Sequence, residues 1–244
     1  MSNSILILGG GSDIGLAIAR VYASNGYNIF LTARNIKDIA FHQRELESVY
    51  KIKVTLLEFD ILKLNSHKFF LESFDKIPEN VVCTVGYMGE QIESQKSQDE
   101  RILVIRTNYE GPVNILSEIA NHFEENQSGN IIGISSVAGE RGRATNYIYG
   151  SSKSGFTTFL SGLRNRLAKK NIHVLTVLPG PVETKMTQGM NLPKFLTSKP
   201  DIVAKKIYNA AIQKKNVIYI KSIWRIIMFL IKIIPERIFK FKNF

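Results

Sequence analysis

Hydrophobic positions along the chain fall into two kinds of run. Short apolar runs of four to eight residues cover 5–8, 28–35, 53–60, 80–86 and 130–136, and runs of this length are typical of buried strands. Between them, apolar residues recur with a helical period, as they do after residue 15 and across 147–168. Strands and helices that alternate in this way predict a doubly wound parallel sheet with helices on both faces, an α/β fold. Ligands should then lie at the carboxyl ends of the strands.

A glycine-rich turn follows the first apolar run. Residues 9–15 read Gly-Gly-Gly-Ser-Asp-Ile-Gly, and helical periodicity begins directly after them. Glycines allow a tight turn and close approach of the backbone to a diphosphate, while a helix N-terminus offers free N–H groups and a positive dipole. The alternative is a turn that binds nothing. The phosphate-binding interpretation assigns cofactor contacts to Gly9, Gly11, Ser12, Asp13, Ile14 and Gly15.

The second apolar run closes on Arg34, with no carboxylate beside it. In a dinucleotide-binding sheet this place lies at the adenosine ribose, where an acidic side chain accepts the 2′-hydroxyl and an arginine accommodates a 2′-phosphate. Arg34 therefore favours NADPH over NADH, and the alternative is a solvated surface arginine. The third run ends in Asp60 and the fourth in Gly86, so both are expected at the ligand edge of the sheet.

A serine, a tyrosine and a lysine follow the fifth run. That run ends at Ser135 and Ser136, and the amphipathic pattern over 147–168 predicts a long helix that carries Tyr149 and Lys153. The four-residue spacing places Tyr149 and Lys153 on one helix face. A phenol, with an ordinary pKa of about 10, is a weak proton donor unless a nearby cation stabilises its phenolate. Lys153 is placed to do this, so the pair suits proton transfer to a forming alkoxide.

These motifs resemble those of the short-chain dehydrogenase/reductase family, over residues 4 to about 185. Tyr149-Gly-Ser-Ser-Lys153 matches the family's Tyr-x-x-x-Lys, Ser136 precedes the tyrosine by thirteen residues, and Asn108 lies in "RTNYEGPVN". The resemblance implies that Tyr149 is the acid/base and that Ser136 holds the substrate oxygen. It implies that Lys153 binds the nicotinamide ribose and lowers the pKa of Tyr149, and that Asn108 positions the water of a proton relay. The alternative, three unrelated structural residues, must explain several coincidences at once.

The same resemblance extends the cofactor site along the chain. Beyond the glycine turn it implies contacts from Arg34, Asp60, Ile61, Gly86, Tyr149, Lys153, Pro179, Val182 and Thr184. Two departures from the family pattern stand out. Asp13 occupies the usual glycine position before Ile-Gly, and residues 83–86 read Cys-Thr-Val-Gly where the family has Asn-Asn-Ala-Gly. Neither removes a catalytic group, but each bears on how the glycine turn and the fourth strand are supported.

Charge and composition restrict the classes of partner and cofactor that we expect for this protein. Of the formal net charge of +11, residues 201–244 contribute ten Lys and Arg against two acids, which is 10 − 2 = +8. No helix-turn-helix, zinc or RNA-binding signature is present, so we expect no nucleic-acid partner. Cys83 is the only cysteine and the four histidines lack ligand spacing, so we expect neither a disulfide nor a metal. The start of the chain does not resemble a signal peptide, which predicts a cytoplasmic protein.

The last residues, 222–244, form a hydrophobic and basic tail. Its apolar run, 226–231, is six residues long before Lys232 interrupts it, whereas a membrane span needs about 20. On a helix the cations of the tail fall in one stripe and most apolar residues turn elsewhere, until Pro235 breaks the helix. The pattern favours contact with a membrane surface. The alternative is that the tail packs on the enzyme's own core, on a partner subunit or on the rim of the active site.

A narrower resemblance concerns the substrate. Residues 135–155, the fourth-strand motif and "WRIIMFLIKIIPERIFK" are similar to reductases of the decaprenylphosphoryl-2-keto-ribose type. This implies a keto-sugar on a polyprenyl phosphate, a precursor of cell-envelope polysaccharide. Arg141 and Arg143 lie between Ser136 and Tyr149, and guanidinium groups suit a phosphate or phosphodiester. One of the two arginines is predicted to hold the anionic link, with a solvated loop charge as the alternative.

We therefore expect one Rossmann-type reductase domain over residues 1–221, followed by an amphipathic basic tail over 222–244. Within the domain, residues 185–199 suit either a lid over an apolar substrate or a surface helix. The protein is expected to be a homo-oligomer that transfers hydride from NADPH to a ketone on a lipid-linked sugar, at the cytoplasmic face of the membrane. Two alternatives stay open: a reductase of a soluble or acyl-type carbonyl with the tail as a lid, and a nucleotide-sensing scaffold with a vestigial triad.

Overall fold

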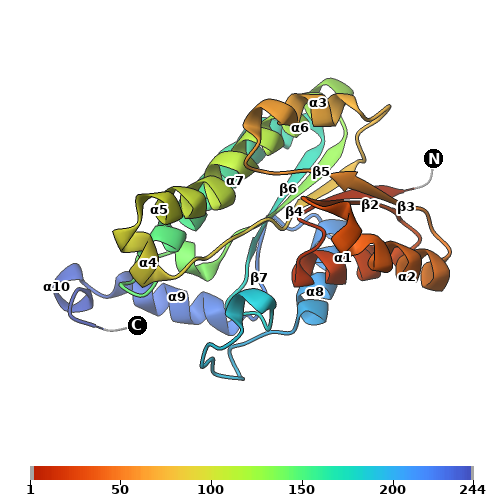
Figure 1. The fold of residues 1–244 in the computed structure, drawn as a ribbon. Coiled ribbons are helices and arrows are strands. Elements are labelled where there is room, and N and C mark those ends of the chain that lie inside the picture. Colours follow the sequence, from red (N-terminus) through yellow and green to blue (C-terminus); the bar gives the residue numbers. More distant parts are fainter. Residues whose placement is uncertain (1–2, 243–244) are drawn as a thin grey trace.

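A seven-stranded sheet organises the computed structural model, which describes residues 3–242 (Figure 1). The strand order is β3-β2-β1-β4-β5-β6-β7, and every neighbouring pair is parallel. The strands are β1 (Ser4–Leu8), β2 (Asn28–Ala33), β3 (Val54–Glu58), β4 (Asn80–Cys83), β5 (Gly129–Ile134), β6 (Ile172–Leu178) and β7 (Val217–Tyr219). The order reverses between β1 and β4, and ligands of doubly wound sheets bind at such a switch point.

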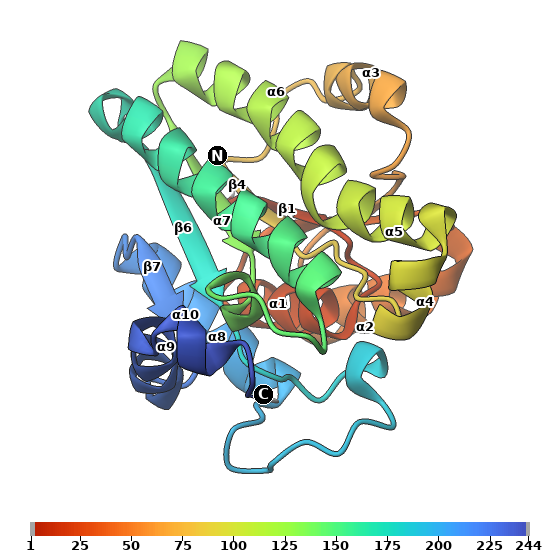
Figure 2. The ribbon, with the colours of Figure 1, turned by 90° about the vertical axis from the view of Figure 1, so that its left-hand side faces the viewer.

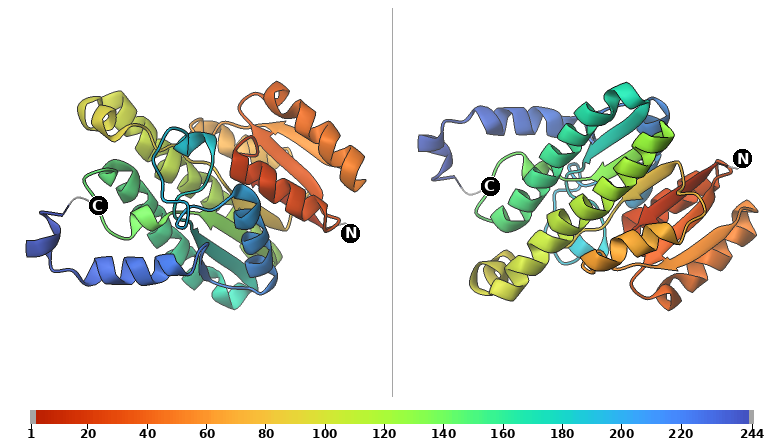
Figure 3. Two further views of the ribbon diagram at one scale, coloured as in Figure 1. Left: turned by 90° about the horizontal axis from the view of Figure 1, so that it is seen from below. Right: turned by 90° about the horizontal axis from the view of Figure 1, so that it is seen from above.

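Helices cover both faces of the sheet, which confirms the predicted α/β architecture (Figures 1 and 3). One face carries α1 (Asp13–Ala23), α2 (Ala40–Tyr50) and α8 (Pro200–Ile212). The other carries α3 (His67–Glu72), α5 (Gln98–Ile105), α6 (Gly111–Asn126) and α7 (Tyr147–Leu167), with α4 (Gln91–Lys96) beside α5. Side chains alternate across each strand, so Ile5 and Ile7 pack beneath α1 and α8 while Leu6 and Leu8 pack beneath α6 and α7.

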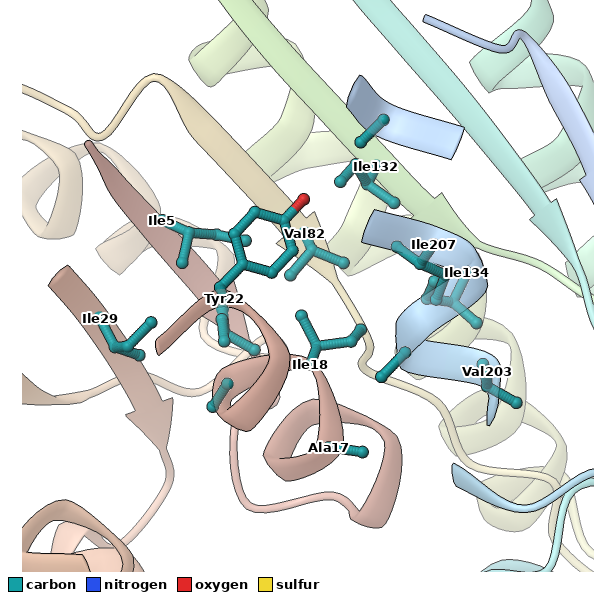
Figure 4. Close-up of a cluster of buried hydrophobic side chains, with 14 of the residues drawn as sticks. Ile5, Ala17, Ile18, Tyr22, Ile29, Val82, Ile132, Ile134, Val203 and Ile207 are labelled. Carbon is teal, nitrogen blue, oxygen red and sulfur yellow. The ribbon is translucent and has the colours of Figure 1, made fainter. Parts of the chain in front are cut away.

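The core under α1 shows why the first helix is fixed relative to the sheet. Tyr22 of α1 is 1% exposed and lies among Ile5, Val82 and Ile132 from three adjacent strands, with Ile207 of α8 nearby (Figure 4). Packing of this density holds α1 in one orientation. The glycine turn at the start of α1 is therefore held rigidly at the carboxyl edge of the sheet.

Four of the five predicted strands are shorter than the apolar runs that predicted them, and β1 is one residue longer. The fourth run extends to Gly86, but β4 ends at Cys83, and the third run extends to Asp60, but β3 ends at Glu58. The extra residues leave the sheet as loops at its carboxyl edge. Asp60 and Gly86 thus lie beyond the strands rather than within them.

The tail forms two helices that pack back on the domain. α9 (Ile223–Ile233) and α10 (Glu236–Phe239) are separated at Pro235, as the sequence predicts. Trp224, Met228 and Phe239 are buried in one cluster with Val137 and Leu178 of the domain. One face of the tail therefore packs on the enzyme's own domain, which was the alternative to contact with a membrane surface. Within residues 3–242, no helix is long and apolar enough to cross a bilayer.

Candidate active site

The glycine turn is closed by Ser12, the N-cap residue of α1. The Ser12 hydroxyl donates to the Gly9 carbonyl (2.8 Å) and accepts from the Gly15 amide (3.0 Å). Gly9 has a φ of +83°, a conformation that favours glycine, and a Cβ on Gly15 would lie 2.6 Å from the Gly9 carbonyl oxygen. The next two amides, of Asp13 and Ile14, occupy the first turn of α1, where a helix supplies no carbonyl partner. The turn therefore fits a diphosphate.

Two threonines, neither of which was predicted from the sequence, form hydrogen bonds with this turn. The Thr84 hydroxyl lies 2.9 Å from the carbonyl oxygens of Leu8 and Gly9, and 3.1 Å from the Ser12 hydroxyl. On the other side, the Gly9 amide donates to the Thr32 hydroxyl (3.1 Å). Thr84 belongs to the Cys-Thr-Val-Gly departure from the family motif. That departure thus keeps a polar side chain that ties the turn to β4.

Asp13 connects the glycine turn to the segment after β6. Its carboxylate accepts a hydrogen bond of 2.7 Å from the backbone amide of Lys185. This contact joins the first turn of α1 to residues 185–199. That segment contains one 3-10 turn, Lys185–Thr187, and is otherwise irregular, so it is a loop rather than a surface helix. A cavity of about 510 Å³ lies between Asp13 and this loop, with Thr184, Gln188 and Met190 in its wall.

The adenosine-side residues lie at the same sheet edge. Arg34 directly follows β2 and its side chain is exposed. Asp60 accepts a hydrogen bond from the Leu62 amide (3.0 Å), which shapes the loop after β3, and Ile61 is buried beside it. An exposed arginine at the end of β2 is where a 2′-phosphate would be met.

Ser136 and Tyr149 approach each other from β5 and α7. Ser136 lies two residues after the end of β5; its hydroxyl accepts from the Ala138 amide (3.1 Å) and donates toward the Pro179 carbonyl (3.5 Å). Burial raises the pKa of the Tyr149 phenol to about 12, and a hydrogen bond with Ser136 opposes that rise. The hydroxyl groups of Ser136 and Tyr149 are therefore neighbours, as a shared contact with one substrate oxygen requires.

Lys153 is a buried cation beside this pair. It is 3% exposed, its ammonium donates to the Ile134 carbonyl (3.0 Å), and its Nζ lies 5.7 Å from the centroid of the Tyr149 ring. Burial lowers the pKa of Lys153 to about 8. A lysine in such a place carries a desolvation cost that function, rather than stability, explains.

Asn108 lies in a π-helical turn, Arg106–Glu110, between α5 and α6. Its side chain is fully buried and bonds to both backbone groups of Tyr87 and to the Val104 carbonyl (2.8 Å). A Cβ on Gly86 would lie 3.3 Å from the Asn108 amide oxygen and 3.5 Å from Lys153 Nζ. Asn108, Lys153 and Gly86 therefore converge on one space, and π-turns are frequent at functional sites.

Pro179, Val182 and Thr184 follow β6 and face the same edge. The Pro179 carbonyl accepts from the Val137 amide (3.0 Å), Val182 is 5% exposed, and Thr184 caps the 3-10 turn of the loop. Between them, Gly180 allows a contact that the sequence analysis missed: a Cβ there would lie 2.0 Å from the Trp224 indole nitrogen. The tail therefore packs directly on the segment predicted to meet the nicotinamide.

The two candidate substrate arginines have different surroundings. The Arg141 guanidinium donates to the carbonyls of Ile231, Lys232 (3.2 Å) and Ile234 (2.8 Å), pairs with Glu236 (2.9 Å) and lies 3.7 Å from the Phe239 ring centroid. It thus caps the carboxyl end of α9, which cations stabilise. Arg143 makes no such contacts. Its buried Nε has no partner among the described residues, and burial lowers its pKa.

Comparisons with known proteins assign this arrangement to a family. The family model described as short chain dehydrogenase matches residues 3–194. An uncharacterised oxidoreductase of Mycobacterium tuberculosis is 30% identical over 241 residues, which span 97% of this chain and 95% of that protein. The chain therefore belongs to the short-chain dehydrogenase family and is an NAD(P)-dependent oxidoreductase.

Further similar proteins agree at the level of fold. The 3-oxoacyl-acyl-carrier-protein reductase of Chlamydia muridarum is 27% identical over 195 residues, 78% of each chain. A short-chain dehydrogenase from Sphingobium yanoikuyae in complex with NADPH superposes with a TM-score of 0.82 at 20% identity, over 96% of this chain and 97% of that one. A 3-oxoacyl-acyl-carrier-protein reductase from Brucella melitensis in complex with NAD gives a TM-score of 0.79 at 23% identity, over 93% and 98%.

Proposed function

We propose that this protein is an NADPH-dependent reductase of a ketone on a sugar carried by a lipid phosphate. The observation that carries the proposal is the junction between the tail and the substrate loop. The Trp224 indole donates to the Leu196 carbonyl (3.1 Å), and the Lys221 ammonium donates to the Phe195 carbonyl (2.7 Å). An apolar helix is thereby joined to the loop that borders the catalytic edge, which suits a substrate with a sugar at one end and a lipid at the other.

The catalytic side chains fit proton transfer to a ketone oxygen. Bound NADPH supplies the hydride to the carbonyl carbon. The Ser136 hydroxyl donates a hydrogen bond to the carbonyl oxygen and holds it beside Tyr149. The Tyr149 phenol gives its proton to that oxygen as charge develops on it, and the Lys153 ammonium stabilises the phenolate that is left. Asn108 and Gly86 border the space beside Lys153 from which a proton can be replaced.

Arg143 is the better placed of the two arginines for an anionic group. Arg141 is already bonded to the tail, whereas Arg143 retains a buried Nε without a partner among residues 3–242. A partly desolvated guanidinium gains most from a charged acceptor such as a phosphodiester. We therefore assign the phosphate link of the substrate to Arg143.

The preference for NADPH is proposed on Arg34. The arginine is exposed at the end of β2, where it can meet a 2′-phosphate. Two structurally similar proteins hold NADPH or NADP, and one holds NAD. Arg34→Asp is expected to lower kcat/KM for NADPH about 10–100-fold while leaving the value for NADH within a few-fold. Equal losses with both cofactors would count against this assignment.

A second candidate is a reductase of an acyl-type ketone, favoured by the similarity to 3-oxoacyl-acyl-carrier-protein reductases. In that case the tail and the loop 185–199 would cover an acyl chain instead of a polyprenyl chain. Both candidates share the same four catalytic groups, so only the substrate separates them.

The deciding experiment measures NADPH oxidation by the purified protein with three ketones: a polyprenyl-phosphate keto-sugar, a 3-oxoacyl thioester and a small neutral ketone. Turnover of the first is expected to exceed that of the others and to disappear in Tyr149→Phe. Arg143→Ala should lower kcat/KM for the phosphate-bearing substrate about 10–100-fold and leave the neutral ketone unchanged. If the thioester is preferred and Arg143→Ala has no effect, the acyl alternative holds.

A further inference from the structure

The helix α9 has two apolar faces, and the domain covers only one. Trp224, Met228 and Ile231 are buried against the domain. On the other side, five large side chains are between 44% and 61% exposed: Ile223, Ile226, Phe229, Leu230 and Ile233. At 3.6 residues per turn these five positions fall within one arc of about 120°. We call this arc the outward face of α9.

Cations border the outward face. Arg225 and Lys232 lie along one edge of α9, seven residues apart, and Lys221 lies two residues before the helix begins. Beyond Pro235 the pattern continues, because Arg237, Lys240 and Lys242 accompany Ile238 and Phe241, which are 46% and 77% exposed. Between residues 221 and 242 the one acid is Glu236, which pairs with Arg141. The tail thus presents apolar side chains and positive charge on the same surface.

The outward face is held in a fixed position on the enzyme. Arg141 caps the carboxyl end of α9, and Glu140 accepts from both Lys232 (2.8 Å) and Tyr219 (2.8 Å). At the other end of the helix, Trp224 bonds to the loop that contains Leu196. Because both ends of α9 are fixed on the domain, its backbone is already ordered, and docking of the outward face does not cost the conformational entropy of folding a helix.

The chemistry of the face favours a lipid bilayer over a second copy of this chain. A basic, apolar helix of eleven residues is too short to span a membrane and suits the interface between headgroups and acyl chains. Of the six cations between residues 221 and 242, Lys232 pairs with Glu140. The other five outnumber the one acid of this segment, and the excess positive charge complements anionic headgroups. A second copy on the same face would instead bring the cationic edges of two tails together.

The loop 185–199 lies on the same side of the molecule. Figures 1 and 2 show α9 and this loop along one edge, below the sheet. Lys221, two residues before α9, donates to the carbonyl of Phe195, which is 71% exposed. We propose that the outward face of α9, together with α10, docks on the surface of a bilayer that contains anionic lipid. This orients the loop toward the lipid. The proposal stands whether or not the substrate is lipid-linked.

Vesicle co-sedimentation of the full chain tests the proposal. The vesicles contain phosphatidylglycerol in phosphatidylcholine, or phosphatidylcholine alone, and no cofactor or substrate is added. The test variant carries Ile226→Gln, Phe229→Gln and Ile233→Gln, which are 59–61% exposed in the wild type. The matched control carries Phe41→Gln, Val49→Gln and Phe69→Gln, which are 63–72% exposed on α2 and α3. A charge variant, Arg225→Gln with Lys240→Gln, keeps the apolar side chains.

We expect the wild type and the control variant to bind the anionic vesicles at least tenfold more strongly than the neutral ones. The test variant is expected to lose that binding, and the charge variant to approach the neutral-vesicle value. Turnover of a small neutral ketone should stay unchanged in all of them, which separates failure of docking from failure of the proposed reaction. The proposal is overturned if the wild type does not sediment, or if the test variant binds as the control does. It is also overturned if light scattering shows that the wild type is an oligomer and the test variant a monomer, because the outward face would then be an interface between copies of this chain.

Discussion

Burial moves the pKa values of two candidate catalytic side chains in opposite directions. It disfavours the charged form of each group, so it raises the pKa of Tyr149 to about 12 and lowers that of Lys153 to about 8. Tyr149 therefore carries its proton throughout the neutral range, as an acid must. Lys153 is charged at neutral pH by a narrow margin, and in the proposed mechanism that charge stabilises the phenolate left after proton transfer.

The pH dependence of ketone reduction should follow Lys153. We expect kcat/KM to be level near neutral pH and to fall as pH rises through about 8, where the lysine loses its proton. A guanidinium stays charged far above this range, so Lys153→Arg should move the fall to higher pH at a lower overall rate. An unmoved profile in that variant would assign the transition to another group.

Lys153 should also reduce stability. Its folded pKa of about 8 lies below the ordinary lysine value of 10.5, so the cost of its buried charge is present below pH 8. That cost is relieved as pH rises from about 8 to 10.5. Lys153→Met is expected to raise the free energy of unfolding at pH 7 by about 1–3 kcal/mol while abolishing turnover. The matched control is Lys205→Met, at an exposed position on α8, measured by the same denaturation. An equal rise in the free energy of unfolding in this control would show that burial of Lys153 is not the cause.

At the scale of elements, the docking of α9 depends on the absence of a side chain at residue 180. Trp224 lies so close to the Gly180 backbone that a methyl group there would overlap the indole. The Leu196 carbonyl fixes the indole from the other side. The loop 185–199 and α9 therefore share Trp224 as a common contact, and a change in the packing of one element alters the packing of the other.

A double-mutant cycle measures this anchor. Gly180→Ala should lower the free energy of unfolding by about 1–3 kcal/mol through overpacking, and Trp224→Ala by about 3–5 kcal/mol through the cavity that it leaves. In the double variant the added methyl group occupies vacated space, so the combined loss should fall below the sum of the single losses. Additive losses in chemical denaturation would show that Gly180 and Trp224 do not interact.

At the scale of the whole molecule, the candidate cofactor site joins two halves of the sheet. The half formed by β1 to β3 contributes the glycine turn and Arg34. The half formed by β4 to β6 contributes Ser136 and lies against α7. Thr84 links the halves through its bonds to the glycine turn. A ligand that spans both halves should stabilise the entire domain rather than one loop.

Thermal unfolding in the presence of cofactor tests this expectation. At a hundredfold excess over its Kd, NADPH should add about 2.7 kcal/mol of stability, which corresponds to a rise in Tm of about 5–10 °C for a domain of this size. Arg34→Asp, a substitution at an exposed position, should reduce the rise with NADPH and preserve that with NADH. If neither cofactor shifts the Tm of the wild type, the glycine turn does not bind a dinucleotide.

The sequence by itself determined the features that depend on local spacing. Although β6 and β7 were not predicted, the first five strands, the glycine turn, the Tyr149–Lys153 pair on one helix face and the break at Pro235 all follow from periodicity or from residues a few positions apart. Each of these depends on backbone geometry that a short segment fixes alone, and the structure confirms them.

Only the tertiary structure decided the contacts between segments far apart in the chain. Thr84 supports the glycine turn 75 residues away, Asp13 bonds Lys185 at a separation of 172, and Arg141 caps a helix more than 90 residues later. No local pattern encodes such pairs, because they arise from packing of the whole sheet. The same packing turned Trp224 inward and left Phe229 outward, a choice between two apolar faces that the amphipathic pattern of the tail could not make.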